Sequence, residues 1–325
     1  MESLFWPLSF FGLAVLIELF LSKKNKLNLH SLEEDLSNIC HGLSQVILNL
    51  SLKIPLFFIY NFFYKHFSFF EIKRSLTSGL LILLLIDLIY YGHHYLSHKI
   101  PLLWANHSVH HQAEKFNFTV GLRPPLLNEI FSFYIHIPLA ILGVSPKIYV
   151  PLFIIHTSFQ LLNHTKLIKK EIPYLRFIFV TPSHHRVHHG QNPRYMNKNF
   201  GALFSFWDRM FGTYAKEKEE VIFGIPHHTL EFNPLISNFT PLLGQKRIKT
   251  FFKGPAFFTS IPYLRPLTLF FFSLTVILCL GLLKVFDDLG PLIFLMVSLY
   301  LFTALCLVGS SLGYLAKTRT SSNGQ

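Results

Sequence analysis

The histidines of this chain are concentrated in three short motifs whose spacing could bind metal. The 325-residue sequence contains 18 histidines, most of them between residues 93 and 189. The motifs HxxxH, HxxHH and HHxxHH begin at His94, His107 and His184. Residues three or four apart share one side of a helix, so each motif is expected to present its imidazoles along one face. Neutral imidazole offers a ring nitrogen to iron, zinc, copper or nickel.

The number of these histidines favours two metal ions over one. A single zinc ion needs about four ligands, and the motifs offer more than twice that number. Surface histidines in a basic membrane protein are the simpler alternative, but they have no reason to repeat a ligand spacing three times. The residues expected to bind metal are His94, His98, His107, His110, His111, His164, His184, His185, His188 and His189. His184 precedes His185 directly and cannot share its helical face, so it binds from a turn or supports a ligand.

A polar stripe runs along an otherwise apolar segment before the third motif. His156, Gln160 and His164 recur at steps of four residues. His164 ends the segment and is the best candidate for a further ligand, with Gln160 beside it in support. His156 is equally well explained as a buried histidine with satisfied hydrogen bonds, and His136 is expected to be structural.

A carboxylate lies on the metal-facing side of the helix that carries the first motif. Stepping back from His98 by three and four residues leads through His94 and Tyr91 to Asp87. An acid within an apolar helix is costly unless it is paired. Asp87 is therefore expected to accept the free N–H of a ligand histidine, which would fix that histidine's tautomer. A hydrogen bond without a role at the metal is the alternative.

The elements that must position these residues are predicted to be membrane helices. Hydrophobic residues make up 51% of the chain, and several apolar runs approach the roughly 20 residues needed to cross a bilayer. Expected spans cover 4–21, 43–63, 76–92, 266–283 and 291–308. Two shorter runs, 130–142 and 149–162, are expected to form a re-entrant hairpin or two tilted spans.

The charge pattern points to lipid as the partner and to a cytoplasmic metal site. The net charge is +12, but the basic residues are spread through loops that flank apolar segments, which favours anionic lipid headgroups over nucleic acid. Lys23, Lys24 and Lys26 follow the first expected span and place its end in the cytoplasm. Counting spans onward puts the histidine motifs on the same side. The pattern does not distinguish a bacterial inner membrane from the endoplasmic reticulum.

These observations predict an all-α integral membrane protein with about four to six spanning or re-entrant helices. Residues 1–92 are expected to form N-terminal transmembrane helices, and residues 93–262 a histidine-box catalytic region. That region would contain the re-entrant hairpin and a cytosolic cap of short helices holding the two metals. Residues 263–325 are expected to form a C-terminal transmembrane hairpin with a polar tail.

The sequence around the motifs resembles a known superfamily. The run from Asp87 to His98, the HxxHH motif with 117–123 after it, and TPSHHRVHHG at 181–190 are similar to the fatty acid hydroxylase and sterol desaturase superfamily of membrane di-iron enzymes. The downstream NP at 192–193, KNFG at 198–201 and WDRMFGT at 207–213 most resemble the alkylglycerol monooxygenase family. The chain departs from that family at Lys99, Pro124 and Asn197, so the resemblance leaves the lipid and the electron donor open.

The resemblance implies an oxidoreductase that binds two Fe ions and uses O2 to hydroxylate a membrane lipid beside an ether oxygen. Tetrahydrobiopterin or another external reductant, such as a redox protein, would supply the electrons. Polar and aromatic residues within the similar runs are expected to support the site or line its pocket. These residues are Asn117, Arg123, Asn192, Asn199, Trp207 and Asp208, with packing as the alternative role for Trp207.

Two other readings remain open from the sequence. A sterol, carotenoid or fatty-acyl hydroxylase or desaturase would share the same iron chemistry. A metal transporter or haem protein is less favoured, because a transporter should place ligands and carboxylates along a mid-membrane path. In this chain the motifs lie at the ends of the expected helices or beyond them.

Overall fold

The computed structural model describes residues 2–169, 173–228, 230–243, 268–270, 272–275, 277–278 and 291–322. These residues are helical or irregular, and their one β-bridge joins Phe179 to Phe204. The predicted all-α class is therefore confirmed. In chain order the helices are α1 (Glu2–Lys24), α2 (Leu32–Phe67), α3 (Leu76–Lys99), α4 (Pro101–His111), η1 (Phe118–Leu122), α5 (Asn128–Ser132), η2 (Phe133–His136), α6 (Ile137–Leu142), α7 (Pro146–Leu161), α8 (Leu175–Ile178), α9 (Pro182–His188), α10 (Phe206–Met210), α11 (Pro234–Leu243) and α14 (Pro291–Ser322).

Two of the described helices are long and apolar enough to cross a membrane, namely α3 and the stretch Val297–Ala316 of α14. The expected spans at 4–21 and 43–63 lie within α1 and α2. Large apolar side chains of α1, including Phe10 and Phe20, are more than half exposed, as residues that face lipid would be. These features fit the membrane protein that the composition predicts. Half of the expected span at 266–283 lies outside the described residues.

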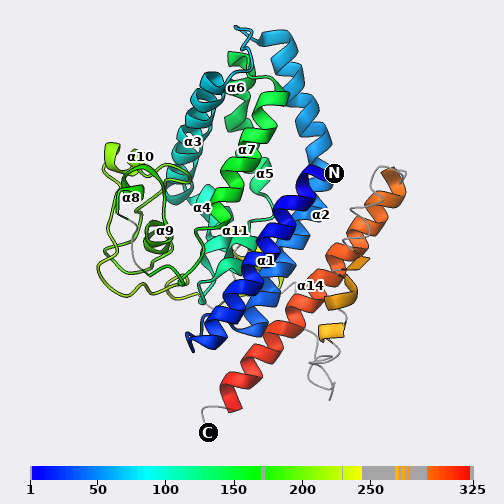
Figure 1. Ribbon diagram of the computed structural model, residues 1–325. Coiled ribbons are helices and arrows are strands. Elements are labelled where there is room, and N and C mark those ends of the chain that lie inside the picture. The colour runs from blue at the N-terminus through cyan, green and yellow to red at the C-terminus, as the bar shows by residue number, and fades with distance from the viewer. Residues whose placement is uncertain are drawn as a thin grey trace.

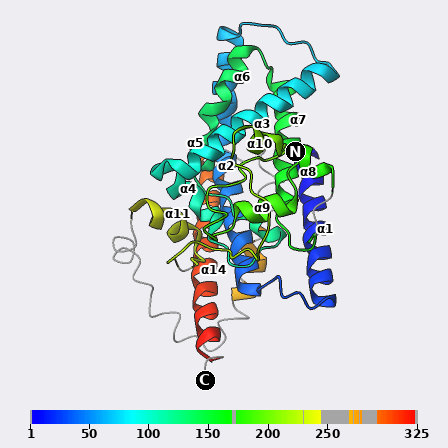
Figure 2. The ribbon, with the colours of Figure 1, turned by 90° about the vertical axis from the view of Figure 1, so that its left-hand side faces the viewer.

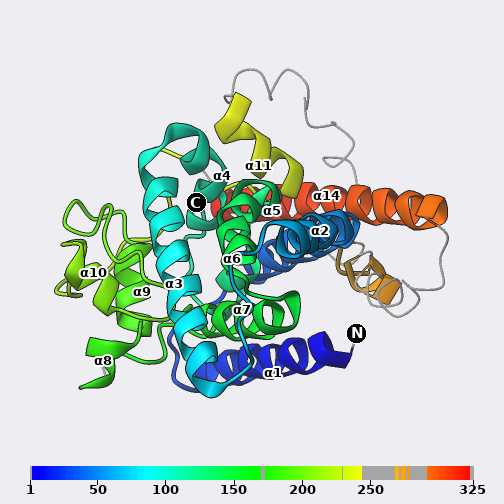
Figure 3. The same cartoon turned by 90° about the horizontal axis from the view of Figure 1, so that it is seen from above.

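The long helices run roughly alongside one another, with α2 packed against α14 and α3 against α7 (Figures 1 and 3). Cys40 of α2 and Leu305 of α14 are fully buried at the first contact. Ile86 of α3 is fully buried in a second apolar cluster with Leu139 of α6. Two apolar clusters thus hold the scaffold from which the histidine motifs project.

The expected hairpin is present, and its turn depends on a glycine. Gly143 joins α6 to α7 with φ of +105°. A Cβ atom there would lie 1.9 Å from the carbonyl oxygen of Phe70, so no other residue fits without movement. The first arm, expected as one run, is divided into α5, η2 and α6. Proline at the start of α6 cannot continue a helix with full hydrogen bonding.

The short helices α8, α9 and α10 and their loops form a lobe beside the end of α3 where the first motif lies (Figures 1 and 2). Arg186 of α9 forms a bidentate pair with Glu217, with nitrogen–oxygen distances of 2.9 and 2.7 Å. The same guanidinium donates to the carbonyl oxygens of Thr165 and Ile168. Arg186 thereby connects α9 to the chain that leaves α7.

Candidate metal centre

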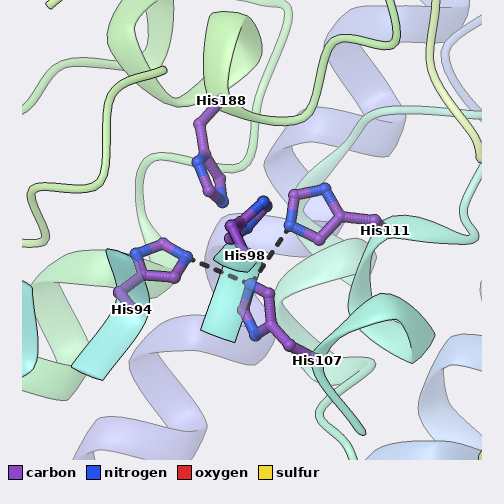
Figure 4. A group of neighbouring side chains, drawn as sticks. All are labelled: His94, His98, His107, His111 and His188. Atoms are coloured by element: carbon purple, nitrogen blue, oxygen red, sulfur yellow. Dashed lines mark hydrogen bonds between the residues drawn. The ribbon is translucent and has the colours of Figure 1, made fainter. Parts of the chain in front are cut away.

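The structure gathers nine of the ten expected histidines into two adjacent groups. Within each group, one ring nitrogen from every residue lies within 4.8 Å of the others. The first group contains His94, His98, His107, His111 and His188 (Figure 4). The second contains His110, His164, His185 and His189. Neither group includes a carboxylate among the described residues, so both have the donor set that imidazole-binding transition metals accept.

Each long motif is divided between the two groups, which differs from the expectation that a motif serves a single face. On α4, His107 and His111 belong to the first group, whereas His110 points to the second. In the third motif, His188 joins the first group and its neighbour His189 the second. Adjacent helical residues diverge by about 100°, so an HH pair can reach two sites. Two separate sites therefore share α4 and the α9 segment.

Backbone carbonyls fix the tautomer of several of these histidines. His94 Nδ1 lies 2.9 Å from the carbonyl oxygen of Phe200, and His188 Nδ1 lies 3.2 Å from that of Lys198. His110 Nδ1 lies 3.2 Å from the carbonyl of Arg123, and His164 Nδ1 lies 3.1 Å from that of Gln160. A carbonyl can only accept, so each Nδ1 carries the proton and donates it. Each Nε2 is left with a lone pair directed into its group.

The resulting arrangement of lone pairs fits a bound cation. His110 Nε2 and His164 Nε2 lie 3.1 Å apart, and neither carries a proton to share. Nitrogen ligands lie about 2.0–2.1 Å from a metal ion, which places neighbouring ligands about 3 Å apart. The 3.0 Å between His94 Nε2 and His107 Nε2 matches this spacing (Figure 4). His98 Nε2 and His188 Nε2 are buried without a protein partner, as open ligand positions would be.

Burial keeps these imidazoles in the neutral form that metal binding requires. Loss of solvent lowers the pKa of His110 to about 4, and the charge of Arg123 adds to the effect. Burial likewise holds the pKa of His164, His185 and His189 well below the ordinary value. A neutral imidazole has the free lone pair that a metal needs.

His184 is the one expected ligand that the structure does not bring to either group. Its Nδ1 atom lies 2.8 Å from the hydroxyl of Thr181, and its ring contacts Tyr214 at a centroid distance of 5.3 Å. His184 and His185 are adjacent on α9 and point in different directions. Of the two roles considered for His184, this position favours support of a neighbouring ligand.

Asp87 accepts hydrogen bonds, but its histidine partner lies outside the metal groups. Its carboxylate accepts from His156 Nε2 at 2.7 Å, from the backbone N–H groups of Leu203 and Phe204, and from Trp207 Nε1 at 2.9 Å. Asp87 therefore ties α3 to α7 and to the loop that carries Phe200, instead of orienting a ligand directly. Trp207 likewise contributes a hydrogen bond to this junction.

The polar stripe on α7 has a structural part and a part at the metal groups. His156 Nδ1 accepts from the Gln160 side chain at 3.1 Å, which agrees with the buried, satisfied role considered for it. The backbone carbonyl oxygen of Gln160 accepts a hydrogen bond from His164 Nδ1. Of the three stripe residues, His164 alone enters a metal group.

Arg123 and Asn117 hold the segment after α4. Arg123 is fully buried, and its guanidinium donates to backbone and side-chain oxygens, including Gln112 Oε1 at 2.9 Å and the Glu231 carbonyl. The backbone carbonyl of Arg123 accepts a hydrogen bond from His110 Nδ1. Asn117 begins η1 by accepting from the N–H of Thr119. Both residues hold in place the segment after α4, whose carbonyl at Arg123 orients His110 of the second group.

Asp208, Asn199 and Asn192 hold the loops around α9. Asp208 accepts from the N–H groups of Phe200 and Gly201 at 2.7 and 2.9 Å, which positions the carbonyl that holds His94. Asn199 donates to the carbonyls of His184 and Ala215. Asn192 donates to the carbonyl of Glu220 and accepts from the N–H of Ile222.

Sequence reasoning missed the carbonyl acceptors of Phe200 and Lys198, because every residue carries a carbonyl and none is marked by its side chain. It also missed Phe116, whose ring lies 5.2 Å from that of His189 between centroids. An aromatic residue among 36 phenylalanines gives no signal of its own. Its position five residues after His111 is the single clue the sequence offers.

Comparison with known proteins identifies the class of domain. Residues 79–213 match the fatty acid hydroxylase family model, a range that includes all nine grouped histidines. This part of the chain is thus similar to the fatty acid hydroxylase family, and the superfamily resemblance seen in the sequence is confirmed. No solved structure matches the chain.

Individual relatives are lipid hydroxylases. The chain is 35% identical to alkylglycerol monooxygenase of Danio rerio over 221 residues, which cover 63% of this chain and 48% of the relative. It is 36% identical to the human enzyme over 53% of this chain and 38% of that one. An ornithine lipid hydroxylase of Rhizobium tropici is 29% identical over 38% of each chain. The chain thus spans about half, or less, of the length of these relatives.

Proposed function

We propose that this protein is an O2-dependent di-iron monooxygenase that hydroxylates a membrane lipid. The observation that carries the proposal is the pair His110 and His164. Their Nε2 atoms face each other at 3.1 Å while both Nδ1 atoms donate to carbonyls. A buried pair of lone pairs at this distance is stable only around a cation. The fatty acid hydroxylase domain favours iron as that cation.

In this proposal the residues of the chain bind the metal ions and orient the ligand histidines. The two histidine groups would each hold an iron ion, and the pair of ions would supply the activation of O2. The carbonyls of Phe200, Lys198, Arg123 and Gln160 keep the ligand nitrogens deprotonated. Apolar burial around the groups excludes water, which limits side reactions of the activated oxidant. We propose that the electrons come from an external donor such as tetrahydrobiopterin or a redox protein, because the given sequence contains no dinucleotide fingerprint or CxxCH haem motif.

We propose an alkylglycerol-type ether lipid as the substrate, on the strength of the names of the relatives. Hydroxylation of the carbon next to the ether oxygen gives a hemiacetal. That hemiacetal breaks down to a fatty aldehyde and the glycerol-bearing part of the lipid.

Hydroxylation or desaturation of a sterol, carotenoid or fatty acyl chain is the second candidate. The similarity to an ornithine lipid hydroxylase favours keeping it, because that protein acts on a lipid without sharing the name of the first relatives. A metal transporter or haem protein is less favoured, since two adjacent histidine groups exceed what one haem requires.

Metal analysis tests the site. Purified parent protein is expected to contain two irons per chain. His164→Ala removes a ligand of the second group and His188→Ala one of the first, and each variant should lose iron. His66→Ala, an exposed histidine far along the chain from the motifs, is the matched control and should keep both ions. One zinc retained in all three variants would contradict the proposal.

Activity tests the substrate. Parent protein in detergent is incubated aerobically with an alkylglycerol, adding tetrahydrobiopterin or a cytochrome-type reductant in separate reactions. Release of fatty aldehyde with either donor supports the proposal. Oxidation of a sterol or acyl lipid without any aldehyde would favour the second candidate.

A further inference from the structure

The lobe beside α3 carries large apolar side chains on its surface, at α8 and α10. Six of them are each more than two-fifths exposed, namely Tyr174, Leu175, Phe177, Ile178, Met210 and Phe211. The two helices are joined, because Arg209 of α10 donates to the carbonyl oxygen of Arg176 of α8 at 3.1 Å. We call these six residues the α8–α10 edge. Exposed apolar residues gathered in this way mark a surface that contacts a protein or a membrane.

Contacts with α3 place this edge at the depth of the membrane. Trp207 of α10 donates to Asp87 at 2.9 Å, and Phe211 stacks on Tyr91 with ring centroids 5.2 Å apart. The helix α3 has 24 residues and is a candidate membrane-crossing helix. A crossing takes about 20 residues, and every stretch of that length within α3 contains both Asp87 and Tyr91. Tyr91 lies about 12 Å along the helix from its end at Lys99.

The figures show the same arrangement. In Figure 1, α10 lies level with α3 and not beyond its end. In Figure 3, α8 and α10 lie on the side of α3 away from α2 and α14. The edge is therefore on the outside of the helix bundle, where lipid would surround it.

The charges at the edge suit the headgroups of anionic lipids. The two helices contain three charged residues, and the one acid, Asp208, is 1% exposed and accepts from the backbone N–H groups of Phe200 and Gly201. Arg176 and Arg209 remain, and the guanidinium groups of both lie over the ring of Phe177, at 4.9 and 5.2 Å from its centroid. Long basic side chains can keep an apolar stem among acyl chains while the charged end reaches a phosphate.

Backbone oxygens at the edge already have donors from the protein. The carbonyl of Arg176 accepts from the Ser205 hydroxyl at 2.7 Å as well as from Arg209. The carbonyl of Ile178 accepts from the N–H of Ser205, and that of Ser205 accepts from Arg209 Nη1 at 3.2 Å. Irregular backbone is tolerated at membrane depth only where such groups are satisfied without water. These hydrogen bonds meet that requirement.

We propose that the α8–α10 edge is immersed in the half of the bilayer toward the Lys99 end of α3. Its apolar side chains contact acyl chains there, and Arg176 and Arg209 reach the headgroup phosphates. A soluble partner could not reach residues level with Tyr91 of a membrane-crossing helix. Part of the region that the sequence predicts as a cytosolic cap would thus lie within the membrane.

This placement would bring lipid close to the first histidine group. Tyr91 contacts Phe200 as well as Phe211, and the ring centroids of Tyr91 and Phe200 lie 6.3 Å apart. The ring of Phe200 lies 5.2 Å from that of His98. Two aromatic rings therefore separate the edge from a member of the first group.

Contact with lipid can be measured directly at the edge. In the full chain with its three native cysteines changed to serine, Phe177→Cys and Met210→Cys each receive a thiol-linked fluorophore. The protein is placed in bilayers of phosphatidylcholine and phosphatidylglycerol, with or without bromine on the acyl chains. Brominated chains quench a fluorophore that touches them, whereas iodide quenches one that is in water.

Two control positions define the expected losses of fluorescence. Leu81→Cys is exposed on α3 and should be quenched by brominated lipid. Ile222→Cys is an equally exposed apolar position of the lobe, but it lies beside Leu29 in the chain after α1, and it should be quenched by iodide. Both edge positions are expected to lose as much fluorescence as Leu81→Cys in brominated bilayers and less than Ile222→Cys in iodide.

The inference is overturned if either edge position behaves like Ile222→Cys, or if neither quencher reaches it, since the second result would mean that protein covers the edge. It is also overturned if Leu81→Cys is quenched by iodide, because α3 would then lie outside the bilayer. Thermal unfolding of each labelled chain at the parent temperature confirms that the fold is kept. The measurement requires neither iron nor turnover, so its result is separate from that of the proposed function.

Discussion

His156 of α7 donates to Asp87 of α3 across a 2.7 Å hydrogen bond, and both side chains are fully buried. The other oxygen of Asp87 accepts from Phe204 and Trp207. This one carboxylate thus joins two long helices to the lobe that contains α9. Its hydrogen bonds hold the lobe in the position from which α9 presents its histidines.

Asp87→Asn is expected to destabilise the protein by about 3 kcal/mol, the order seen when one partner of a buried pair is removed. An amide has one acceptor oxygen in place of two, so at least one of four donors loses its partner. Thermal unfolding in detergent measures the effect. Glu71→Gln, an exposed acid, is the control, and an equal melting temperature for D87N and the parent would contradict the role given to Asp87.

Removal of metal should lower the melting temperature, because the facing lone pairs of His110 and His164 lose the cation between them. A ligand present at about 100 times its dissociation constant stabilises a fold by about 2.7 kcal/mol. Chelation followed by readdition of ferrous iron should lower and then restore the transition. The His164→Ala variant should respond less than the parent, and an identical response would count against a metal at the second group.

The sequence allowed the nine histidines to be found because ligand spacing is local. Steps of three and four residues along one helix do not depend on the rest of the fold. The division of the second and third motifs between the two groups could not be found in this way, since it depends on how α4 crosses α3 and how α9 packs against both. His110 and His111 are neighbours in sequence and belong to different groups for this reason.

The hydrogen-bond partners of the histidines could not be predicted from the sequence for a different reason. Asp87 was expected to accept from a ligand histidine because Asp87 and the first motif share a face of α3. The donor that a buried carboxylate pairs with is instead set by the tertiary fold. That donor is His156, 69 residues away. Long-range pairs between α3 and α7 carry no periodic signal.

Glu34 predicts a pH dependence of stability. Burial raises the pKa of this carboxyl to about 7, although it accepts from the N–H groups of Glu114 and Lys115. The folded state therefore binds a proton that the unfolded state has released above its ordinary pKa of 4.5. Stability from this group is complete below pH 4.5 and is lost as the pH rises through about 7.

Glu34→Gln should accordingly remove part of the fall in melting temperature between pH 5 and pH 8, values that bracket most of the transition by linkage. Its amide oxygen still accepts from both N–H groups. Melting curves of the parent, E34Q and the exposed control Glu71→Gln across this range measure the effect. Parallel curves for E34Q and the parent would show that Glu34 does not titrate in this way.

Gly143→Ala should destabilise the hairpin between α6 and α7 by about 1–3 kcal/mol, since a Cβ atom would meet the Phe70 carbonyl in a left-handed conformation. Gly212 also has positive φ, +71°, but a Cβ atom there has open space around it. Gly212→Ala therefore introduces backbone strain without a steric clash, and it should destabilise the protein less than Gly143→Ala does. Comparable melting temperatures for the two variants would argue against the collision.

The proposed cytoplasmic orientation predicts unequal labelling at two exposed sites. In a chain with its three native cysteines changed to serine, Glu220→Cys, exposed in the chain after α10, should be shielded in intact cells from a membrane-impermeant thiol reagent. Phe69→Cys, on the connection between α2 and α3, should react at once. Reversed labelling would mean that the histidine groups face outward.

Both histidine groups include residues of α4 and of the α9 segment, which are separated by 70 residues of chain. Once α3 and α4 have been synthesised, four of the five residues of the first group and one of the four residues of the second are present. Neither group is complete until α9 emerges and its lobe docks on Asp87. Binding of the two proposed irons would therefore wait until α9 has been synthesised, and a chain truncated before α9 would be expected to lack the proposed metal centre.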